Sequence, residues 1–535
     1  MKNKEETKGF FPEDFQFNQA DYDYLYNYLL EKEVPLTSIE ITGALIRERI
    51  RLRKKEQEKK EKALGNVYRP KNHYKVDEKV VFPFLANKAG KVVSVRKGNN
   101  PELPEFDVTE FEFPDGSTRF FATNLSTHAL NTEIYSSKNG TPIPEAEEVL
   151  KQVGGKLAKS IHKQLMESKE LFGLADFWFP IALLSEVNKG YLNLAEAVLE
   201  MDEGMPVGTR KILEMIEYPT DSNEQLTEFS FNYALHNDDR FDEVGPTGVV
   251  LWTLKQLEPE DVRKKPLTLR SYHPEPDLQE EILETLCLLK IPDELEPCML
   301  ETPEKSPSSY KICVSYPHWK AGTLPLIGPI RSIFPTAMET DKIIFDMIDT
   351  NKNERFQAWV VLSENYVSGL KNWYRENGVI PGSYILVSEV KNSSAVSISL
   401  IPPRSSKEWV RTALFSQKGN LEFDFRQQPI TTEFDERMCI FVENSPQLDL
   451  IWEKYNKPDV NFNRLLEYVF KELSRNNAQQ IVHFDEIYAG INMLNRCPPG
   501  QLFTKLLESD KIVPLEDLYF KASPVGAQEE VNVEQ

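Results

Sequence analysis

The side chains best placed to do chemistry are four carboxylates in a short run, Asp238, Asp239, Asp242 and Glu243. Carboxylate oxygens are the ligands that divalent cations such as Ca²⁺ and Mg²⁺ prefer, so this run is a candidate for holding one ion. The alternative is an acidic loop that faces water and binds nothing. We adopt this second interpretation, and the sequence therefore predicts no metal site and no cofactor.

The sequence contains none of the short motifs that carry catalysis. It lacks the Gly-x-x-x-x-Gly-Lys, Gly-x-Gly-x-x-Gly, Gly-x-Ser-x-Gly and His-Glu-x-x-His patterns, and Gly154-Gly155 has no following Lys-Ser/Thr pair. The seven histidines are far apart in the chain: His73, His128, His162, His236, His273, His318 and His483. We predict a non-enzymatic protein with no catalytic residue. A divergent metal-dependent nuclease with dispersed carboxylates is the alternative.

One stretch of the chain, residues 47–71, is strongly basic. It holds eleven Lys/Arg against four Glu, a local excess of +7. Such a stretch can lie along a phosphate backbone and gain affinity by counterion release. The alternative is a solvated helix that touches nothing. The candidate nucleic-acid-binding residues are Arg47, Arg49, Arg51, Arg53, Lys54, Lys55, Lys59 and Lys60.

Length and composition bound the rest of the interpretation. The 535 residues suffice for three or four domains, and the net charge of -21 argues against a surface coated for nucleic acid throughout. Five scattered cysteines indicate a reducing compartment and argue against a structural zinc site. We see neither a signal peptide nor a run of about 18 apolar residues, so we expect a cytoplasmic protein without a membrane contact.

Residues 188–254 have the order of signals of three helices and a hairpin. Asn193 and Glu196 are spaced as a helix start, and apolar residues then recur at helical spacing. Two further helices are predicted, around Ile212 and around Tyr233. Two apolar runs joined by Gly245-Pro246-Thr247-Gly248 predict the hairpin. Three helices and a hairpin indicate a winged helix.

This region resembles the HARE-type winged helix, the module also found in the delta subunit of bacterial RNA polymerase. The resemblance is carried by the helix 192–201, the Gly-Met-Pro-Val connection and the closing RFDEVGPTGVVLWTL. It implies a role near transcription or DNA. Yet residues 192–260 hold fifteen Asp/Glu against four Lys/Arg, a net of -11, which would repel phosphates. We therefore predict a protein-docking module, with Phe229, Tyr233, Phe241 and Trp252 as docking residues.

Two strand-rich segments carry weaker resemblances. Residues 72–131 are predicted to form five short strands, and YKVDEKVVFPFLANKAGKVVSV resembles the small SH3-like barrel of CarD-type and Tudor-type factors. That resemblance implies binding to polymerase or to other proteins, and a simple spacer is the alternative. Residues 311–403, with a predicted hairpin at 342–362, a helix at 366–376 and a Pro381-Gly382 turn, are similar to the DNA-binding pseudobarrel of plant transcription factors and some restriction enzymes.

The C-terminal region carries a further helical pattern. Apolar residues from Phe462 to Leu473 recur at i, i+3, i+4 and i+7, and two more helical runs follow. We read this region as a possible third winged helix, with positive charge from Arg475, Arg496, Lys505 and Lys511.

The predicted fold class is α+β multidomain, with winged-helix-like modules alternating with small β-barrels. The predicted segments are a disordered lead at 1–20, a helix-turn-helix-like half without a wing at 21–71, the small barrel at 72–131, a linker at 132–146, a helical segment plus the HARE-like module at 147–257, a Pro/Glu-rich linker with one short helix at 258–310, the second β-rich domain at 311–403, the C-terminal helical domain at 404–522 and a disordered tail at 523–535.

Taken together, the sequence favours a non-enzymatic, transcription- or DNA-associated adaptor. The basic helix would contact DNA or RNA, while the acidic module would dock a protein partner such as RNA polymerase. A small-molecule ligand is not expected. The chief alternative is a purely protein-binding scaffold.

Overall fold

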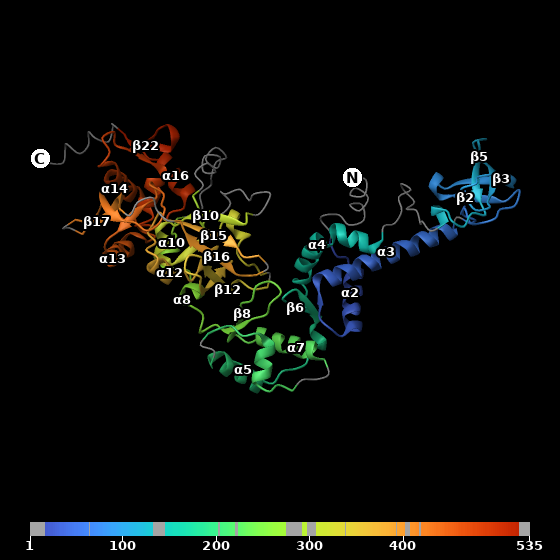
Figure 1. Ribbon diagram of the computed structural model, residues 1–535, viewed down its shortest axis with the longest axis horizontal. Helices are drawn as coiled ribbons and strands as arrows, with labels where there is room; N and C mark the ends of the chain where they lie inside the picture. Colours follow the sequence, from blue (N-terminus) through green and yellow to red (C-terminus); the bar gives the residue numbers. More distant parts are fainter. Residues whose placement is uncertain are drawn as a thin grey trace. The chain divides into compact units, whose positions relative to one another are not determined.

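The computed structural model describes residues 16–63, 65–131, 145–201, 204–219, 223–273, 291–296, 307–337, 339–391, 393–401, 407–416 and 419–523. Helices and several separate sheets confirm the α+β multidomain fold class (Figure 1). Residues 1–15 of the lead predicted at 1–20, nearly all of the linker at 132–146, the short helix predicted at 282–289 and the tail after Ser523 lie outside the described residues. The last two residues of that lead belong to a helix, Gln19–Lys32, rather than to a disordered segment. No described helix combines the length and apolar character needed to cross a bilayer.

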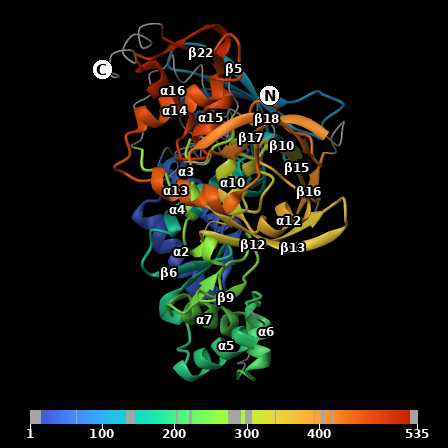
Figure 2. The same cartoon turned by 90° about the vertical axis from the view of Figure 1, so that its left-hand side faces the viewer.

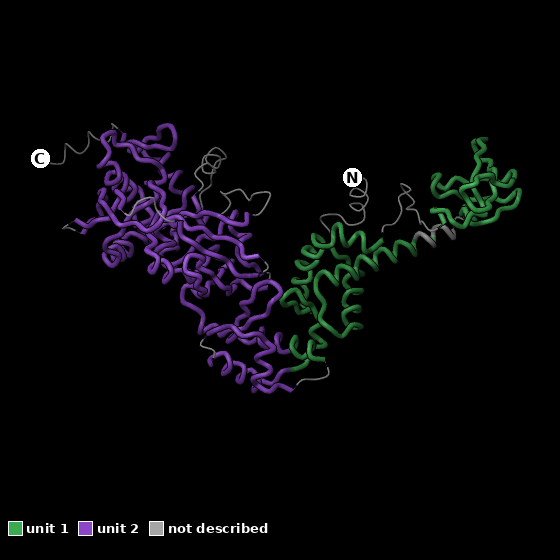
Figure 3. Tube along the Cα trace, viewed as in Figure 1, with its two compact units in different colours: residues 1–186, 220–230 green, residues 187–219, 231–535 purple. Residues whose placement is uncertain are grey.

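The chain divides into two compact units (Figure 3). One contains residues 1–186 and 220–230, and the other contains residues 187–219 and 231–535. The boundary between them falls within one helix, so that helix contributes residues to both units.

The first unit contains a module of three helices and three strands, which we call the first module. Its elements are α2 (Gln19–Lys32), β1 (Leu36–Thr37), α3 (Ser38–Ala63), α4 (Ala146–Leu165), β6 (Leu171–Leu174) and β7 (Phe177–Pro180). The strands form one sheet in the order β1-β7-β6. The helix-turn-helix half predicted at 21–71 is therefore joined by a hairpin, β6 and β7, that comes much later in the sequence.

The first module has one apolar core. It is built from Leu25 and Leu29 of α2, Ile41 and Leu45 of α3, and further buried residues of α4 and the hairpin. Trp178 lies in this core and donates a hydrogen bond from its indole nitrogen to the hydroxyl of Ser38 at 2.9 Å. The sequence grouped the helix after residue 147 with the following module, but the structure packs α4 against α3.

A four-stranded domain is inserted between α3 and α4. Its strands are β2 (Lys79–Phe82), β3 (Lys88–Lys97), β4 (Asp107–Glu112) and β5 (Thr118–Thr123), with short helices η1 (Pro83–Leu85) and η2 (Ala129–Asn131). They pair antiparallel in the order β2-β3-β4-β5. Aromatic rings fill its core: Tyr68 stacks on Phe82, and Phe111 meets Phe82 edge to face. The structure gives four strands where the sequence predicted five.

The second module repeats the plan of the first. Its elements are α5 (Lys189–Met201), α6 (Thr209–Met215), α7 (Glu224–His236), β8 (Phe241–Glu243) and β9 (Trp252–Leu254). Val207 takes the place of the first strand, because it exchanges backbone hydrogen bonds of 2.9 Å with Trp252. The predicted hairpin is confirmed. The boundary between the two units falls within α7.

The start of α5 differs from the prediction. The helix begins at Lys189, and the Asn188 carboxamide accepts a hydrogen bond from the backbone N–H of Gly190 at 2.8 Å. Asn193 and Glu196 do not cap it. Their side chains instead bind the guanidinium of Arg240, with 2.9 Å from Arg240 Nη1 to Asn193 Oδ1.

A seven-stranded sheet follows in the second unit. Its strands are β10 (Ser309–Cys313), β11 (Thr323–Pro325), β12 (Lys342–Asp349), β13 (Glu354–Val361), β14 (Tyr366–Ser368), β15 (Tyr384–Glu389) and β16 (Val396–Leu400), in the order β10-β15-β16-β12-β13-β14-β11. The hairpin predicted at 342–362 is confirmed. Within this sheet β12 and β16 pair parallel, and the other neighbouring strands pair antiparallel. Short helices accompany the sheet: α8 (Glu260–Arg263), η4 (Leu267–Leu269), α10 (Tyr316–Ala321), α11 (Gly328–Arg331) and α12 (Lys371–Glu376).

The C-terminal region begins with strands that the sequence analysis did not predict. These are β17 (Lys407–Phe415), β18 (Leu421–Pro429) and β19 (Ile440–Val442), followed by α13 (Ser445–Tyr455). The third module then comprises α14 (Phe462–Ser474), β20 (Ile481–His483), α15 (Phe484–Ile491), α16 (Pro499–Leu507), β21 (Ile512–Pro514), η6 (Glu516–Leu518) and β22 (Tyr519–Ala522). In Figure 2 its helices gather beside β22. The three helices predicted here are confirmed.

The three modules share one topology. In each, a helix and a short strand precede two helices and a hairpin, and the first strand pairs antiparallel with the last strand of the hairpin. In such a module each helix buries the side that faces the sheet and the other two helices, and its opposite side faces solvent. The exposed side of the third helix of a module, which is α4, α7 or α16, can therefore serve as a binding surface.

Candidate functional site

One face of α4 carries four lysines at helical spacing. Lys151, Lys156, Lys159 and Lys163 are all exposed. At about 100° per residue the four lysines fall within an arc of about 140° of the helix circumference, over about 18 Å at a rise of 1.5 Å per residue. The opposite side is buried in the core of the first module through Val149, Leu157, Ile161 and Leu165. We call the exposed side the lysine face.

The described residues around the lysine face leave its charge without an ion-pair partner. Within the described part of the chain, none of the four lysines forms an ion pair. The carboxylates of α4 are Glu147 and Glu148, both in its first turn, where they suit the positive end of the helix dipole. The lysines from position 151 onward therefore present a purely cationic surface.

A glycine lies in the middle of the lysine face. Gly155 is exposed, and a Cβ atom built there would meet nothing within 4 Å. Its neighbour Gly154 faces the other way, where a Cβ would lie 3.6 Å from Ile39 of α3. A helix surface without a side chain at its centre allows another molecule's backbone to approach closely.

The predicted basic residues of α3 are only partly available. Arg49 binds the carboxylate of Asp21 through two hydrogen bonds, one of 2.9 Å from its Nε. Arg51 binds Glu48 through two bonds of 2.7 Å, and the Lys54 ammonium lies 3.6 Å from a carboxylate oxygen of Glu145. Arg47, Lys55 and Lys59 are exposed, and Arg53 is exposed but has an interaction partner within the protein. The side chain of Lys60 lies outside the described residues.

The residues predicted to dock a protein partner are placed in the interior. Phe229, Phe241 and Trp252 are 6%, 2% and 1% exposed, and Tyr233 is half-buried. Phe229 packs against the rings of Phe172 and Phe179 in the first unit, at 5.3 and 6.4 Å between centroids. Phe229, Phe241 and Trp252 are therefore core residues with little surface to offer a partner, while the half-buried Tyr233 keeps part of its ring at the surface.

The hydrogen bonds of Trp252 show how its polar N–H is satisfied inside the core. Its indole nitrogen donates to the Thr209 hydroxyl at 3.1 Å and to the Asn232 carboxamide oxygen at 3.0 Å. A buried tryptophan needs a partner for this N–H, and the second module supplies two.

The positive charges predicted for the third module are all paired. Arg496 is fully buried, and its guanidinium binds Asp293 and Glu294 at 2.6 and 2.8 Å. On the surface of the module, Arg475 lies 3.4 Å from Glu472, Lys505 2.7 Å from Glu508, and Lys511 2.9 Å from Glu467. The positive charge predicted from these four residues is therefore balanced by carboxylates of the same chain.

The acidic run is used within the protein. Asp238 binds Arg240 at 2.7 Å, Asp242 binds Lys342 at 3.1 Å, and Glu243 accepts from the backbone N–H of Gly245 at 2.8 Å. Burial raises the pKa of Glu243 to about 7. Among the described residues, no group of three or more His, Cys, Asp or Glu side chains is arranged to hold a metal ion.

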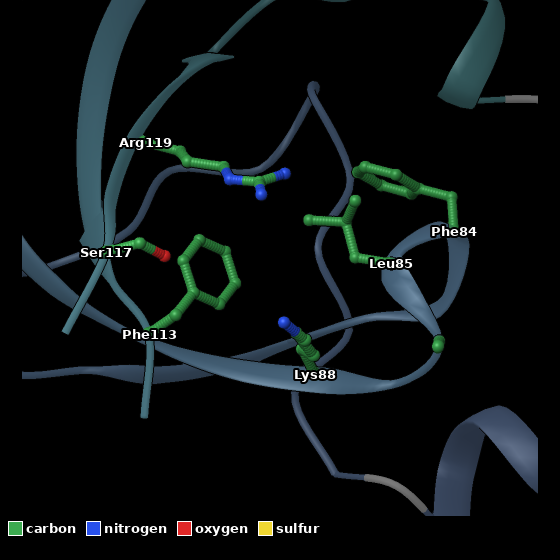
Figure 4. A pocket seen from close by; sticks show the side chains of 7 residues that line it. Phe84, Leu85, Lys88, Phe113, Ser117 and Arg119 are labelled. Atoms are coloured by element: carbon green, nitrogen blue, oxygen red, sulfur yellow. The ribbon is translucent and has the colours of Figure 1, made fainter. Parts of the chain in front are cut away.

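The four-stranded domain has a hollow of about 330 Å³ (Figure 4). Phe113 forms one side and Phe84 with Leu85 the other, while Lys88 and Arg119 reach in between them. The Arg119 guanidinium lies 5.9 Å from the centre of the Phe113 ring, and the Lys88 ammonium lies 2.9 Å from Asp115. An apolar floor beside two cations suits an apolar group with an anionic end, but half of this charge is already paired with Asp115.

The lysine face is not among the sites predicted from the sequence. A count of charges along the chain gives only a small positive excess here, because Glu147 and Glu148 come shortly before the lysines. The signal that could have found it is the period of the lysines relative to the apolar residues. Val149, Val153, Leu157, Ile161 and Leu165 recur every four residues, so a helix must turn the intervening lysines toward solvent.

No family model, curated protein or solved structure matches this chain.

Proposed function

We propose that the protein is a non-enzymatic, DNA-associated adaptor whose first module binds duplex DNA through α4. The observation that carries the proposal is the lysine face, since Lys151, Lys156, Lys159 and Lys163 are exposed on the third helix of the module and form no ion pair with another described residue. Helix-turn-helix proteins place the corresponding helix in the major groove. In this proposal the three repeated modules are winged helices.

The lysine face fits DNA better than double-stranded RNA. A B-DNA major groove is wide enough to admit an α-helix, whereas the major groove of A-form RNA is deep and narrow. Gly155 keeps the centre of the face low, so the helix can sit close to the groove floor. Lysines at both ends then reach the phosphates on either side. These contacts are with phosphates, so they position the module without reading sequence.

The exposed residues of α3 supply a second, smaller source of positive charge. Arg47, Arg53, Lys55 and Lys59 belong to the helix that packs against α4. They extend the cationic surface of the first module in this proposal. A protein partner such as RNA polymerase would then dock elsewhere, on a surface of opposite charge.

The test is the salt dependence of binding to a duplex of about 20 base pairs, measured by fluorescence anisotropy. Each phosphate contact adds about 0.9 to the slope of log affinity against log salt concentration. We expect Lys151→Gln, Lys156→Gln, Lys159→Gln and Lys163→Gln together to lower the slope by about 3 to 4. The matched control replaces four other exposed lysines with Gln: Lys255, Lys264, Lys352 and Lys391.

The outcomes separate the alternatives. An unchanged slope in the α4 variant, or an equal loss in the control, overturns the proposal. Loss only when Arg47, Arg53, Lys55 and Lys59 are replaced by Gln moves the site to α3. A wild type without salt-dependent binding favours the protein-binding scaffold. Cleavage of the duplex in Mg²⁺ favours the metal-dependent nuclease.

A further inference from the structure

The second module has an exposed apolar face that the structure leaves uncovered. It runs along α5 and continues onto the two loops beside it. Its large side chains are Leu194, Met201, Met205 and Leu257, which are 49%, 73%, 51% and 40% exposed. Single exposed apolar side chains are ordinary on protein surfaces, so the argument depends on their forming one patch.

The geometry makes these residues neighbours. Leu194, Ala197 and Met201 are spaced by three and four residues, so they line one side of α5, and Ala197 is exposed with them. Beyond the end of α5, a Cβ built on Gly204 would lie 3.4 Å from the Cβ of Leu257.

The two loops are also tied to α5 itself. Gln256 donates a hydrogen bond of 3.4 Å to Glu200 of α5. The loops carrying Met205 and Leu257 therefore meet at the C-terminal end of the α5 stripe. We call this set the methionine face.

The charge around the methionine face is strongly negative. Glu200, Glu214 and Glu217 are exposed on the same module, and Glu260 is exposed at the start of α8, shortly after it in the chain. Residues 192–260 carry fifteen acidic against four basic side chains. A second copy of this chain would bring the same negative charge against itself. Nucleic acid would be repelled in the same way. A partner with basic side chains is attracted.

We propose that the methionine face binds a basic amphipathic helix of a partner protein. Flexible methionine side chains adapt to apolar partners, and helices dock with anchors at i, i+3, i+4 and i+7. The stripe from Leu194 to Met201 spans about 10 Å, which is two turns of such a helix. Lysines or arginines flanking the apolar anchors of the partner then meet the glutamates at the rim. The proposal is independent of DNA binding, because it uses none of the residues of the first module.

The probe is a labelled peptide of about fourteen residues in which leucines and lysines alternate with the period of an amphipathic helix. A scrambled peptide has the same composition but no apolar side. Binding is measured by fluorescence anisotropy at physiological salt. We expect the amphipathic peptide to bind at least about tenfold more tightly than the scrambled one, since only the former can place its leucines on the methionine face.

The test variant is Leu194→Gln with Met201→Gln, and the matched control is Leu267→Gln with Leu450→Gln. The control residues are 63% and 69% exposed, so both variants change only surface side chains. We expect about a tenfold or greater loss of peptide affinity in the test variant and less than a twofold change in the control. Circular dichroism checks that both variants fold, and DNA affinity serves as an unaffected reference.

Three results would overturn the proposal. One is equal binding of the scrambled peptide, which would show attraction by charge alone. Another is an equal loss of affinity in the control variant. The last is self-association of the wild type that the test variant abolishes in sedimentation experiments, since the methionine face would then be covered by a second copy.

Discussion

The third helices of the first and third modules hold equivalent positions in the repeated plan but have different surroundings. α4 turns Lys151, Lys156, Lys159 and Lys163 toward solvent. In α16, six of nine residues are buried, and the backbone N–H of Gly500 in its first turn donates 2.7 Å to the carboxylate of Glu296. A carboxylate of the chain itself thus occupies the kind of position where an anionic ligand would bind a helix N-terminus.

The difference lies in a short segment outside the module. Residues 291–296 are almost entirely buried, and their carboxylates contact the third module through Arg496, Tyr488 and Gly500. The same arrangement of helices and strands therefore presents an exposed cationic face on α4, whereas residues 291–296 cover the start of α16. Fold does not determine function, because the surface residues decide what each copy of the plan can bind.

The largest effect is expected from removing the ion pairs that hold the buried segment 291–296 against the third module. Arg496 and its partners Asp293 and Glu294 are 0–1% exposed, and Glu294 also accepts from His318 at 2.7 Å. Burial alone would raise the pKa of Glu294, but Arg496 and His318 hold it well below its usual range. Arg496→Met leaves two carboxylates buried without their cation. We expect it to lower the free energy of unfolding by about 3 to 5 kcal/mol, measured by denaturant titration.

The control for this variant is Arg475→Met. Arg475 also pairs with a carboxylate, Glu472 at 3.4 Å, but its side chain is 54% exposed. An exposed pair contributes at most about 1 kcal/mol, so this variant should differ little from wild type. Equal destabilisation by the two substitutions would mean that the segment 291–296 does not seal the module as described.

A smaller effect is expected in the core of the first module. A Cβ on Gly173 of β6 would lie 2.5 Å from the ring of Trp178, which is 1% exposed. The indole cannot withdraw without losing its hydrogen bond to Ser38. We expect Gly173→Ala to destabilise the protein by about 1 to 3 kcal/mol, measured by thermal unfolding. A change of less than half a kilocalorie, about the scatter of surface substitutions, would show that the hairpin can shift freely.

The stability contributed by the contact between residues 291–296 and α16 should also depend on pH. Burial raises the pKa of Glu296 to about 7, from an ordinary value of 4.5. Between these values the folded protein keeps a proton that the unfolded chain releases. The contribution of Glu296 to the free energy of unfolding therefore falls as pH rises from 4.5 to 7, and is constant above 7.

Glu296→Gln removes this titration while keeping an oxygen that can accept from Gly500. We expect the variant to gain stability relative to wild type as pH rises from about 5 to 8, measured as the difference between their melting temperatures at each pH. Glu508→Gln, at an exposed pair with Lys505, is the matched control and should give a constant difference. Parallel curves for Glu296→Gln and wild type would contradict a buried, proton-holding carboxylate.

What the sequence could predict depends on how local the signal is. The hairpin of β12 and β13 is readable because its strands are adjacent and a turn at Asn351–Asn353 separates them. The apolar spacing of α14 is readable for the same reason. By contrast, 82 residues separate Ala63 of α3 from Ala146 of α4, so no local pattern assigns α4 to the first module.

The candidate site residues were likewise predictable only where their contacts are local in the sequence. Arg496 counts as a positive charge in the sequence, but its partner Asp293 lies 203 residues away, and only their contact shows that the charge is buried. The aromatic residues Phe241 and Trp252 are equally suited to a core or to a docking surface, and burial decides between them. Charge runs were found where they are contiguous, as in α3, and missed where only the helical projection gathers them, as in α4.

The smallest effect, and the most direct probe of the lysine face, concerns Gly155. A helical glycine with open space around its Cα is less stable than alanine, because glycine loses more conformational freedom on folding. We expect Gly155→Ala to raise the free energy of unfolding by about 0.5 to 1 kcal/mol. The opposite glycine, Gly154, should not gain as much, since its Cβ would lie 2.8 Å from a methyl group of Leu150.

A larger side chain at the same position separates stability from binding. Gly155→Tyr projects a ring from the centre of the lysine face, where nothing in the first module obstructs it. Thermal unfolding should therefore stay close to wild type, while the ring holds α4 away from the groove and weakens duplex binding by about tenfold or more. All four lysines remain in this variant, so the loss cannot come from reduced charge. Full DNA affinity in Gly155→Tyr would show that the lysines attract DNA without α4 entering the groove.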